Sequence, residues 1–181
     1  QRQMCIRDRS DFGKTKVAYF SALYEPMRTS IIEHPAYVTE VNVGLLGQFD
    51  FVFVCVDKGP ARRLICSHLI DQGVPFIDCG MDMSLSTAQQ IFGTCRVTIA
   101  TPARNKHFFD RAPTMEDAGD ALYDQNIQIA DANALNAILA VMRWKQHFGF
   151  YAMNWDWHHL EFATSAMALA RAERSEGTDA N

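Results

Sequence analysis

The sequence predicts an α/β fold, and three successive segments carry that prediction. Phe51–Val56 is a run of six consecutive apolar residues, which is typical of a central parallel strand buried on both faces. Pro60–Gln72 has helical spacing of its apolar residues, with proline in the first turn, and Val74–Cys79 is a second apolar strand. Strand, helix and strand in about thirty residues form a βαβ unit with a right-handed crossover. We therefore expect a Rossmann-like, partly parallel sheet flanked by helices, with additional antiparallel strands in the C-terminal portion.

Two elements are expected before this unit. Asp11–Met27 predicts a helix, because its apolar residues at positions 17, 20, 23, 24 and 27 share one face. Ala36–Val43 alternates polar and apolar residues and predicts a strand. The first ten residues, Gln1–Ser10, mix charges around a short apolar triplet and resemble translated sequencing adaptor. We expect residues 1–10 to be a non-native leader and exclude them from the fold.

The remaining elements are less regular. Strand-like content occurs at 82–87 and 94–100, and again at Trp155–Phe162. Thr101–Asp124 is polar and predicts a long loop. Asn126–Phe148 predicts the longest helix; it is apolar nearly all round between residues 127 and 144, so we expect it to be buried in the core or at a subunit interface.

The tail from residue 166 to 181 is small and charged, and we expect it to be frayed. The body, residues 11–165, is expected to form one partial domain.

Composition excludes several classes of function. The chain has 181 residues with 21 acidic and 17 basic side chains, a formal charge of −4, which argues against a nucleic-acid partner. No apolar run approaches the roughly 20 residues of a membrane span. The five cysteines form no C-x-x-C pair, so we expect no zinc site, and we interpret them as mostly buried thiols of a cytoplasmic protein.

Asp57 is the sharpest candidate for a functional residue, because it directly follows the apolar strand at its carboxyl end. Ligands of open α/β sheets bind at that edge, where a carboxylate can hold a metal ion or a ribose hydroxyl. The alternative is that Asp57 only caps the next helix. Arg62 and Arg63 stand near the start of that helix, where a bound anion would offset their conflict with the helix dipole. Their alternative is an exposed salt bridge to Asp57 or Asp71.

The sequence contains no glycine-rich phosphate-loop motif, since no three of its ten glycines fit G-x-G-x-x-G. The histidines also lack a spacing that makes a site. His158 and His159 would point to opposite faces of a strand.

Several of these segments together resemble the ThiF/MoeB/HesA-type adenylyltransferases, which are relatives of ubiquitin-activating enzymes. The resemblance covers residues 10 to 162. Its motifs are, in order, D-x-G-K-x-K (Asp11–Lys16), C-x-D (Cys55–Asp57), G-V-P-F-I-D (Gly73–Asp78), I-Q-I-A-D-A-N-A-L-N-A (Ile127–Ala137) and R-W-K (Arg143–Lys145).

The resemblance implies ATP-dependent adenylation of the C-terminal carboxylate of a ubiquitin-like or sulfur-carrier protein, with ATP and Mg²⁺ as cofactors. Lys16 matches the family's phosphate-contacting lysine, Asp57 its magnesium and adenylate aspartate, and Arg62 the arginine of the following helix. Lys58 replaces the family's usual asparagine at a ribose or phosphate contact. Cys79 and Cys95 are candidates for accepting the activated partner, and the resemblance is compatible with a homodimer.

The resemblance also places the glycine-rich loop upstream of Ser10. We therefore expect an N-terminally truncated enzyme that binds ATP more weakly than about 10 μM on its own. Two alternatives remain open: a fragment of an NAD(P)-binding Rossmann oxidoreductase, and a non-catalytic protein-binding module on the same scaffold.

Overall fold

The computed structural model describes residues 13–112 and 129–172. Its contacts divide the chain into two compact units, residues 1–38 and residues 39–181. The sequence did not indicate this boundary, and the two units are taken in turn.

The first unit contains helix α1, Lys16–Tyr24. Thr15 caps it, because the Thr15 hydroxyl oxygen accepts a hydrogen bond from the backbone N–H of Ala18 at 3.3 Å. The helix predicted over Asp11–Met27 is thus confirmed over Lys16–Tyr24; residues 13–15 and 25–27 are not helical, and residues 11–12 lie outside the described part of the chain.

The strand predicted over Ala36–Val43 is wrong. Those residues form no strand, and the 3₁₀ helix η2 begins at its last residue and spans Val43–Gln48. Asn42 gives the reason, because its side-chain oxygen accepts a hydrogen bond from the Thr39 N–H at 2.7 Å while the Asn42 N–H bonds the Thr39 carbonyl. These local bonds satisfy the backbone in a turn, in competition with a sheet ladder.

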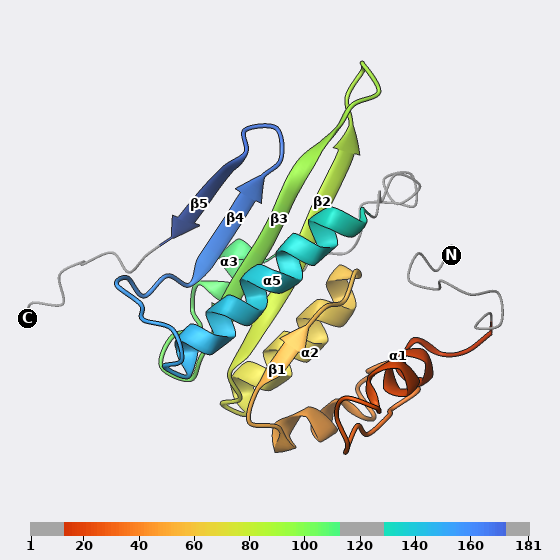
Figure 1. Cartoon of the computed structure of the whole chain (residues 1–181). Helices are drawn as coiled ribbons and strands as arrows, with labels where there is room; N and C mark the ends of the chain where they lie inside the picture. The colour runs from red at the N-terminus through yellow and green to blue at the C-terminus, as the bar shows by residue number, and fades with distance from the viewer. Residues whose placement is uncertain (1–12, 113–128, 173–181) are drawn as a thin grey trace, which may run out of the picture. The chain divides into compact units, whose positions relative to one another are not determined.

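The second unit is a five-stranded mixed sheet with the strands in sequence order (Figure 1). The first two strands are parallel, with Val54 opposite Asp78, and every later neighbour is antiparallel. The mixed α/β class with antiparallel strands in its C-terminal portion is therefore confirmed. The strands are β1 (Val52–Val54), β2 (Phe76–Leu85), β3 (Ile91–Ala100), β4 (His159–Ala163) and β5 (Ala168–Ala172).

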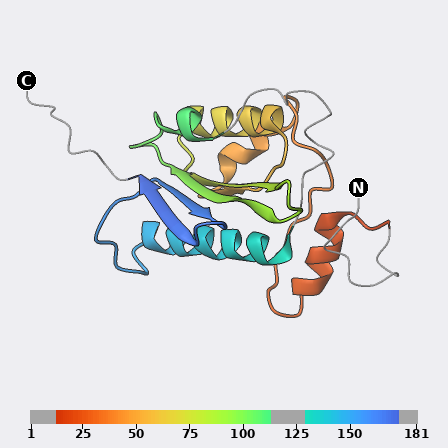
Figure 2. The ribbon, with the colours of Figure 1, turned by 90° about the horizontal axis from the view of Figure 1, so that it is seen from above.

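Helices cover both faces of this sheet. Figure 2 shows α2 (Gly59–Asp71) and α3 (Phe108–Arg111) on one face and α5 (Ala130–His147) on the other. On the α2 side, the rings of Phe76 and Phe108 meet edge to face at 4.9 Å. On the α5 side, a core cluster consists of Ile77, Val97, Ile99, Ala140, Trp157 and Leu160.

The position predicted for the first apolar strand is wrong. Only residues 52–54 of Phe51–Val56 form β1, which lies at an edge of the described sheet, and Phe53 is 42% exposed. The ladder of β1 ends at Val54, and by Val56 the chain has left it: the Val56 carbonyl accepts a hydrogen bond from the Arg62 guanidinium in place of a ladder partner, and α2 starts at Gly59.

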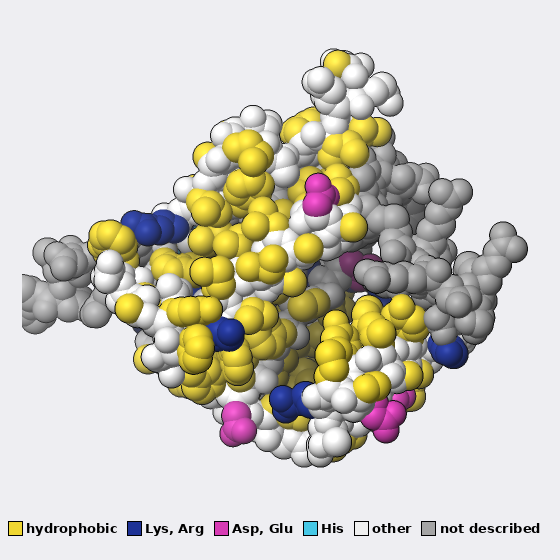
Figure 3. Space-filling model, viewed as in Figure 1, with side chains coloured by type: hydrophobic (Ala, Val, Ile, Leu, Met, Phe, Trp, Pro, Cys, Tyr) yellow, Lys and Arg dark blue, Asp and Glu magenta, His cyan; other side chains and the backbone are white. Residues whose placement is uncertain are grey.

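Helix α5 forms within the predicted Asn126–Phe148, of which residues 126–128 lie outside the described part of the chain. Burial of all its sides in the core is wrong, and burial of its outer side at a subunit interface stays a prediction. Its sheet-facing residues are buried at helical spacing: Ala132, Asn136, Ala140 and Arg143. Its opposite face is apolar and exposed; we call this face the α5 outer strip, and it consists of Ala134, Ala137, Ile138, Val141 and Met142. Figure 3 shows hydrophobic side chains gathered over the face of the molecule that carries α5.

The described part of the tail, up to residue 172, contains a strand that was not expected. Residues 168–172 form β5, paired with β4 over five residues, whereas a frayed segment was predicted from 166. Within 13–112 and 129–172, no helix combines the length and apolar character needed to cross a membrane.

Candidate functional site

The carboxyl end of β1 presents Asp57 at the start of the turn into α2. Asp57 and Lys58 are exposed, and Lys58 occupies the N-cap position in an extended conformation without a capping bond from its side chain. Gly59 and Pro60 then begin the helix. The alternative role for Asp57, capping α2, does not fit this geometry, because the N-cap position belongs to Lys58.

Arg62 lies one turn into α2 and is 5% exposed. Its Nε donates to Asp78 Oδ1 at 2.8 Å, and its Nη2 donates to the Val56 carbonyl. The exposed salt bridge to Asp57 or Asp71 is thus wrong; the partner is a buried carboxylate in β2. Arg62 thereby ties the first turn of α2 to the segment that follows β1 and to the third residue of β2, and its contact with phosphate stays a prediction.

Asp78 is held by a second arginine from β3. Arg96 Nη1 lies 2.9 Å from Asp78 Oδ2, and the Asp78 side chain is fully buried. Gly80 makes room for this guanidinium, because a Cβ there would lie 2.1 Å from Arg96 Nη2. One carboxylate therefore serves two buried guanidiniums, a group that we call the Asp78 triad.

The polar row continues across the sheet from the Asp78 triad. Thr98 lies directly opposite Asp78, and His159 directly opposite Thr98. Thr98 Oγ1 is 3.0 Å from His159 Nδ1 and 3.4 Å from Arg96 Nη1. Sequence reasoning missed Arg96, Thr98 and His159 as one group, because they share a face only through strand register.

Lys16, the phosphate candidate, is the exposed first residue of α1 in the other unit. Its role stays a prediction.

A metal ion would find few protein ligands here. Within residues 13–112 and 129–172, no group of three or more histidine, cysteine, aspartate or glutamate side chains could hold one. Mg²⁺, however, is commonly bound through one or two carboxylates together with nucleotide phosphates and water. An exposed Asp57 fits that mode, in which the nucleotide brings most of the ligands.

Among the described cysteines, Cys55 is the exception to the predicted burial. Cys66 and Cys95 are buried and Cys79 is partly buried, but Cys55 is exposed. Burial raises the pKa of the Cys66 and Cys95 thiols. Cys95, a candidate for accepting an activated partner, instead donates to the Ala132 carbonyl at 3.4 Å.

A cavity of about 510 Å³ lies between η2 and α2. Arg63, Ser67 and His68 are among its lining residues, whereas Asp57, Lys58 and Arg62 do not line it. Pro60 also lines it, so the cavity borders the turn that carries Asp57 although the Asp57 side chain does not line it.

Two histidines form a pair that the sequence did not reveal. The rings of His107 and His158 are 4.1 Å apart, and His107 Nε2 lies 2.9 Å from the Ile99 carbonyl. Burial, followed by the nearby His107, lowers the pKa of His158 to about 4. Both rings are therefore expected to be neutral at pH 7.

Comparison with known proteins adds no relative: no protein-family model matches the chain, and no curated protein matches it.

Proposed function

We propose that residues 56–60 form part of a nucleotide site used to adenylate the C-terminal carboxylate of a ubiquitin-like or sulfur-carrier protein. The observation that supports this most is the exposed Asp57 beyond the carboxyl end of a parallel strand, directly before α2. Ligands of open α/β sheets bind at this edge. The motifs C-x-D (Cys55–Asp57) and G-V-P-F-I-D (Gly73–Asp78), with Arg62 between them, are the reason that we assign this edge to adenylation.

In this proposal Asp57 holds the Mg²⁺ of Mg-ATP, and the metal supplies charge neutralisation at the phosphates. The partner's carboxylate attacks the α-phosphorus, an acyl-phosphate bond forms, and pyrophosphate leaves. Negative charge grows on phosphate oxygens during this step, and fixed cations stabilise it. Lys58 is the exposed cation of this edge assigned to that task, and the phosphate role of Lys16 stays a separate prediction.

Arg62 acts in this scheme chiefly as a positioning residue. Its guanidinium holds the Val56 carbonyl and Asp78 at once, so it fixes the turn that presents Asp57. Substitution of Arg62 should therefore disturb both the turn and the stability of the second unit.

The test compares two aspartates at opposite ends of β1. Asp57→Ala removes the carboxylate after the strand, and Asp50→Ala removes an exposed carboxylate before it. Mg-ATP is titrated into each protein, with NMR or calorimetric detection in the millimolar range. We expect weak binding by the wild type and by Asp50→Ala, and loss of binding in Asp57→Ala. Equal binding by all three proteins would contradict the role of Asp57.

Pyrophosphate exchange separates adenylation from mere nucleotide binding. We expect exchange between ATP and labelled pyrophosphate only when a ubiquitin-like carrier protein with a free C-terminal glycine is present, and none with Asp57→Ala. Preferential binding of NADH over Mg-ATP would favour the oxidoreductase alternative.

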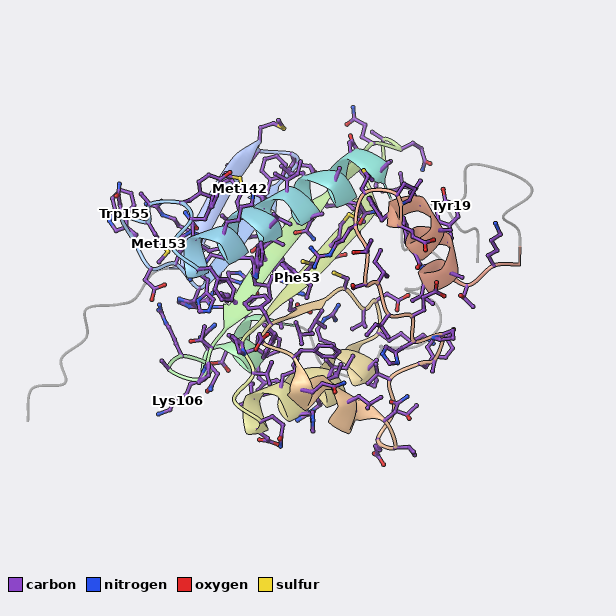
Figure 4. The ribbon with its side chains drawn as sticks, turned by 60° about the horizontal axis from the view of Figure 1, so that its bottom comes forward. Tyr19, Phe53, Lys106, Met142, Met153 and Trp155 are labelled. Carbon is purple, nitrogen blue, oxygen red and sulfur yellow. The ribbon has the colours of Figure 1, made fainter. Side chains whose placement is uncertain are left out.

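The α5 outer strip favours a second candidate, a protein-binding module. Ile138, Val141 and Met142 are 42–56% exposed, and apolar patches on a surface mark interaction sites. Figure 4 places Met142 on α5, with Met153 and Trp155 in the segment that follows it. Binding of a carrier protein by the wild type without nucleotide, and its loss in Val141→Glu, would support this module. A homodimer would instead show a molecular mass that depends on protein concentration.

A further inference from the structure

Cys55 and Cys79 lie side by side on neighbouring parallel strands. Val54 is opposite Asp78 at the last registered position of β1 and β2, so the next residues along, Cys55 and Cys79, are neighbours. Strands in a sheet are about 4.8 Å apart, which lies within the Cα separation of about 4.4–6.8 Å that a disulfide requires.

The two side chains point to the same side of the sheet and touch. Cys79 packs against the core cluster beneath α5, and Phe53, two residues before Cys55, meets Trp144 of α5 at 6.1 Å between ring centroids. A side-chain hydrogen bond joins Cys55 and Cys79. The thiols therefore need no change of strand register to react with each other.

Their surroundings give the two thiols different roles. Cys55 is exposed, and its hydrogen bond with Cys79 lowers the pKa of the Cys55 thiol. The same bond, followed by burial, raises the pKa of Cys79. A low-pKa, accessible thiol beside a partner of higher pKa is the arrangement of an attacking and a resolving cysteine.

We propose that Cys55 and Cys79 form a reversible disulfide by exchange with a small disulfide of the glutathione type. The Cys55 thiolate attacks one sulfur of the oxidised reagent, forming a mixed disulfide and releasing one reagent thiol. Cys79 gives up its proton and attacks the Cys55 sulfur, which releases the second reagent thiol. Two protein thiols are oxidised, and the two sulfurs of the reagent are reduced.

The bond would join the end of β1 to β2 two residues before Asp57. It would fix the edge strand, whose ladder in the described sheet is only three residues long, against its neighbour. The dithiol is independent of nucleotide binding, so its test needs neither ATP nor a carrier protein.

The test is thiol mapping of the whole chain in glutathione buffers from fully reduced to fully oxidised. A Cys5→Ser background removes the thiol that lies outside the described residues. After acid quenching, alkylation and proteolysis, we expect a peptide linking Cys55 to Cys79, loss of both free thiols together, and recovery of both in reduced glutathione. A glutathione adduct left on Cys55 without this link, a link to Cys66 or Cys95, or an unreactive Cys55 would each overturn the proposal.

Two substitutions of Cys79 separate the effect of the disulfide from the effect of the hydrogen bond between the thiols. Cys79→Ser keeps a donor beside Cys55 but cannot form the disulfide, whereas Cys79→Ala removes both. We expect Cys55 to stay as a glutathione adduct in both variants. The pH midpoint for alkylation of Cys55 should rise in Cys79→Ala and stay near the wild-type value in Cys79→Ser; a midpoint unchanged in both would contradict the pairing. Thiol mapping of the wild type decides the proposal even where a variant fails to fold.

Discussion

Asp78 is the counter-charge of two buried arginines on the sheet face beneath α2. Arg62 and Arg96 reach it from different elements, at 2.8 and 2.9 Å. The three side chains are nearly withdrawn from water, where an uncompensated charge is costly. Each arginine therefore depends on the same carboxylate, and the geometry of the turn before α2 depends on one of those arginines.

Replacing Asp78 by asparagine should destabilise the second unit strongly. The substitution keeps the shape but leaves two buried guanidiniums without a counter-charge, which by analogy with broken buried pairs costs about 3–5 kcal/mol in the free energy of unfolding. Asp82→Asn is the matched control on the same strand, because Asp82 is exposed and should change stability by less than about 0.5 kcal/mol. Urea unfolding of both variants measures the difference; similar midpoints would show that the triad is dispensable.

At this scale the sequence predicts positions better than partners. Asp57 lies at the end of the predicted strand, as its place after an apolar run indicates. The partner of Arg62 is sixteen residues away in another element, so no local pattern could name it. A signal for its burial was nevertheless present: Arg62, Ile65, Cys66 and Leu69 have helical spacing on one face of α2 and are all buried.

At the scale of elements, apolar composition predicts that a helix or strand favours burial, but it does not predict which other segment or partner buries it. The residues of β1 and α5 are apolar enough for burial on all sides, yet Phe53 and Ile138 are 42% and 56% exposed. The α5 helix itself was predictable because its apolar segment is long and its apolar residues recur with helical spacing. Its outer strip shows that the same composition also suits a face open to a partner.

Strand β5 is an element that local propensity does not predict. Its residues, A-L-A-R-A, are good helix formers. They form a strand because five of them pair with β4, from His159 opposite Ala172 to Ala163 opposite Ala168. Strand pairing of this kind is set by tertiary context, which overrides propensity.

Removal of β5 should therefore weaken the second unit. A chain ending at residue 165 loses the cross-strand pairs of β4 and β5 and also the bond from the His158 N–H to the Ala172 carbonyl, 3.1 Å long. At roughly 0.2–1 kcal/mol for each of the five pairs, we expect a loss of about 1–5 kcal/mol in the free energy of unfolding. A chain ending at residue 172 is the control and should unfold near the wild-type midpoint. Equal midpoints for the two truncations would show that β5 adds nothing.

At the scale of the whole molecule, the predicted βαβ unit and mixed sheet class are confirmed, and features that need several segments at once were not predictable. The histidines are the clearest case. They have no sequence spacing that makes a site, yet His107 from the loop before α3 meets His158 from the segment before β4. Their proximity follows from the register of β3 and β4, which brings residue 99 beside residue 158.

This pair makes global stability depend on pH. Burial lowers the pKa of His158 from 6.5 to about 4, and it also lowers the pKa of His107 and His159. A histidine with a depressed folded-state pKa binds its proton more readily in the unfolded chain, so stability is full above pH 6.5 and falls as the pH drops toward 4. At about 1.4 kcal/mol for each pKa unit, His158 contributes at most about 3 kcal/mol to that fall.

His158→Phe should reduce this dependence, because phenylalanine keeps a ring beside His107 but takes up no proton. Urea unfolding at pH 7 and pH 5 gives the slope for each protein, and the difference between wild type and variant removes the background from carboxylates, which titrate in both. His34→Phe replaces an exposed histidine and should retain the wild-type slope. If His158→Phe loses as much stability between pH 7 and pH 5 as the wild type does, the His107–His158 pair is not the group that titrates.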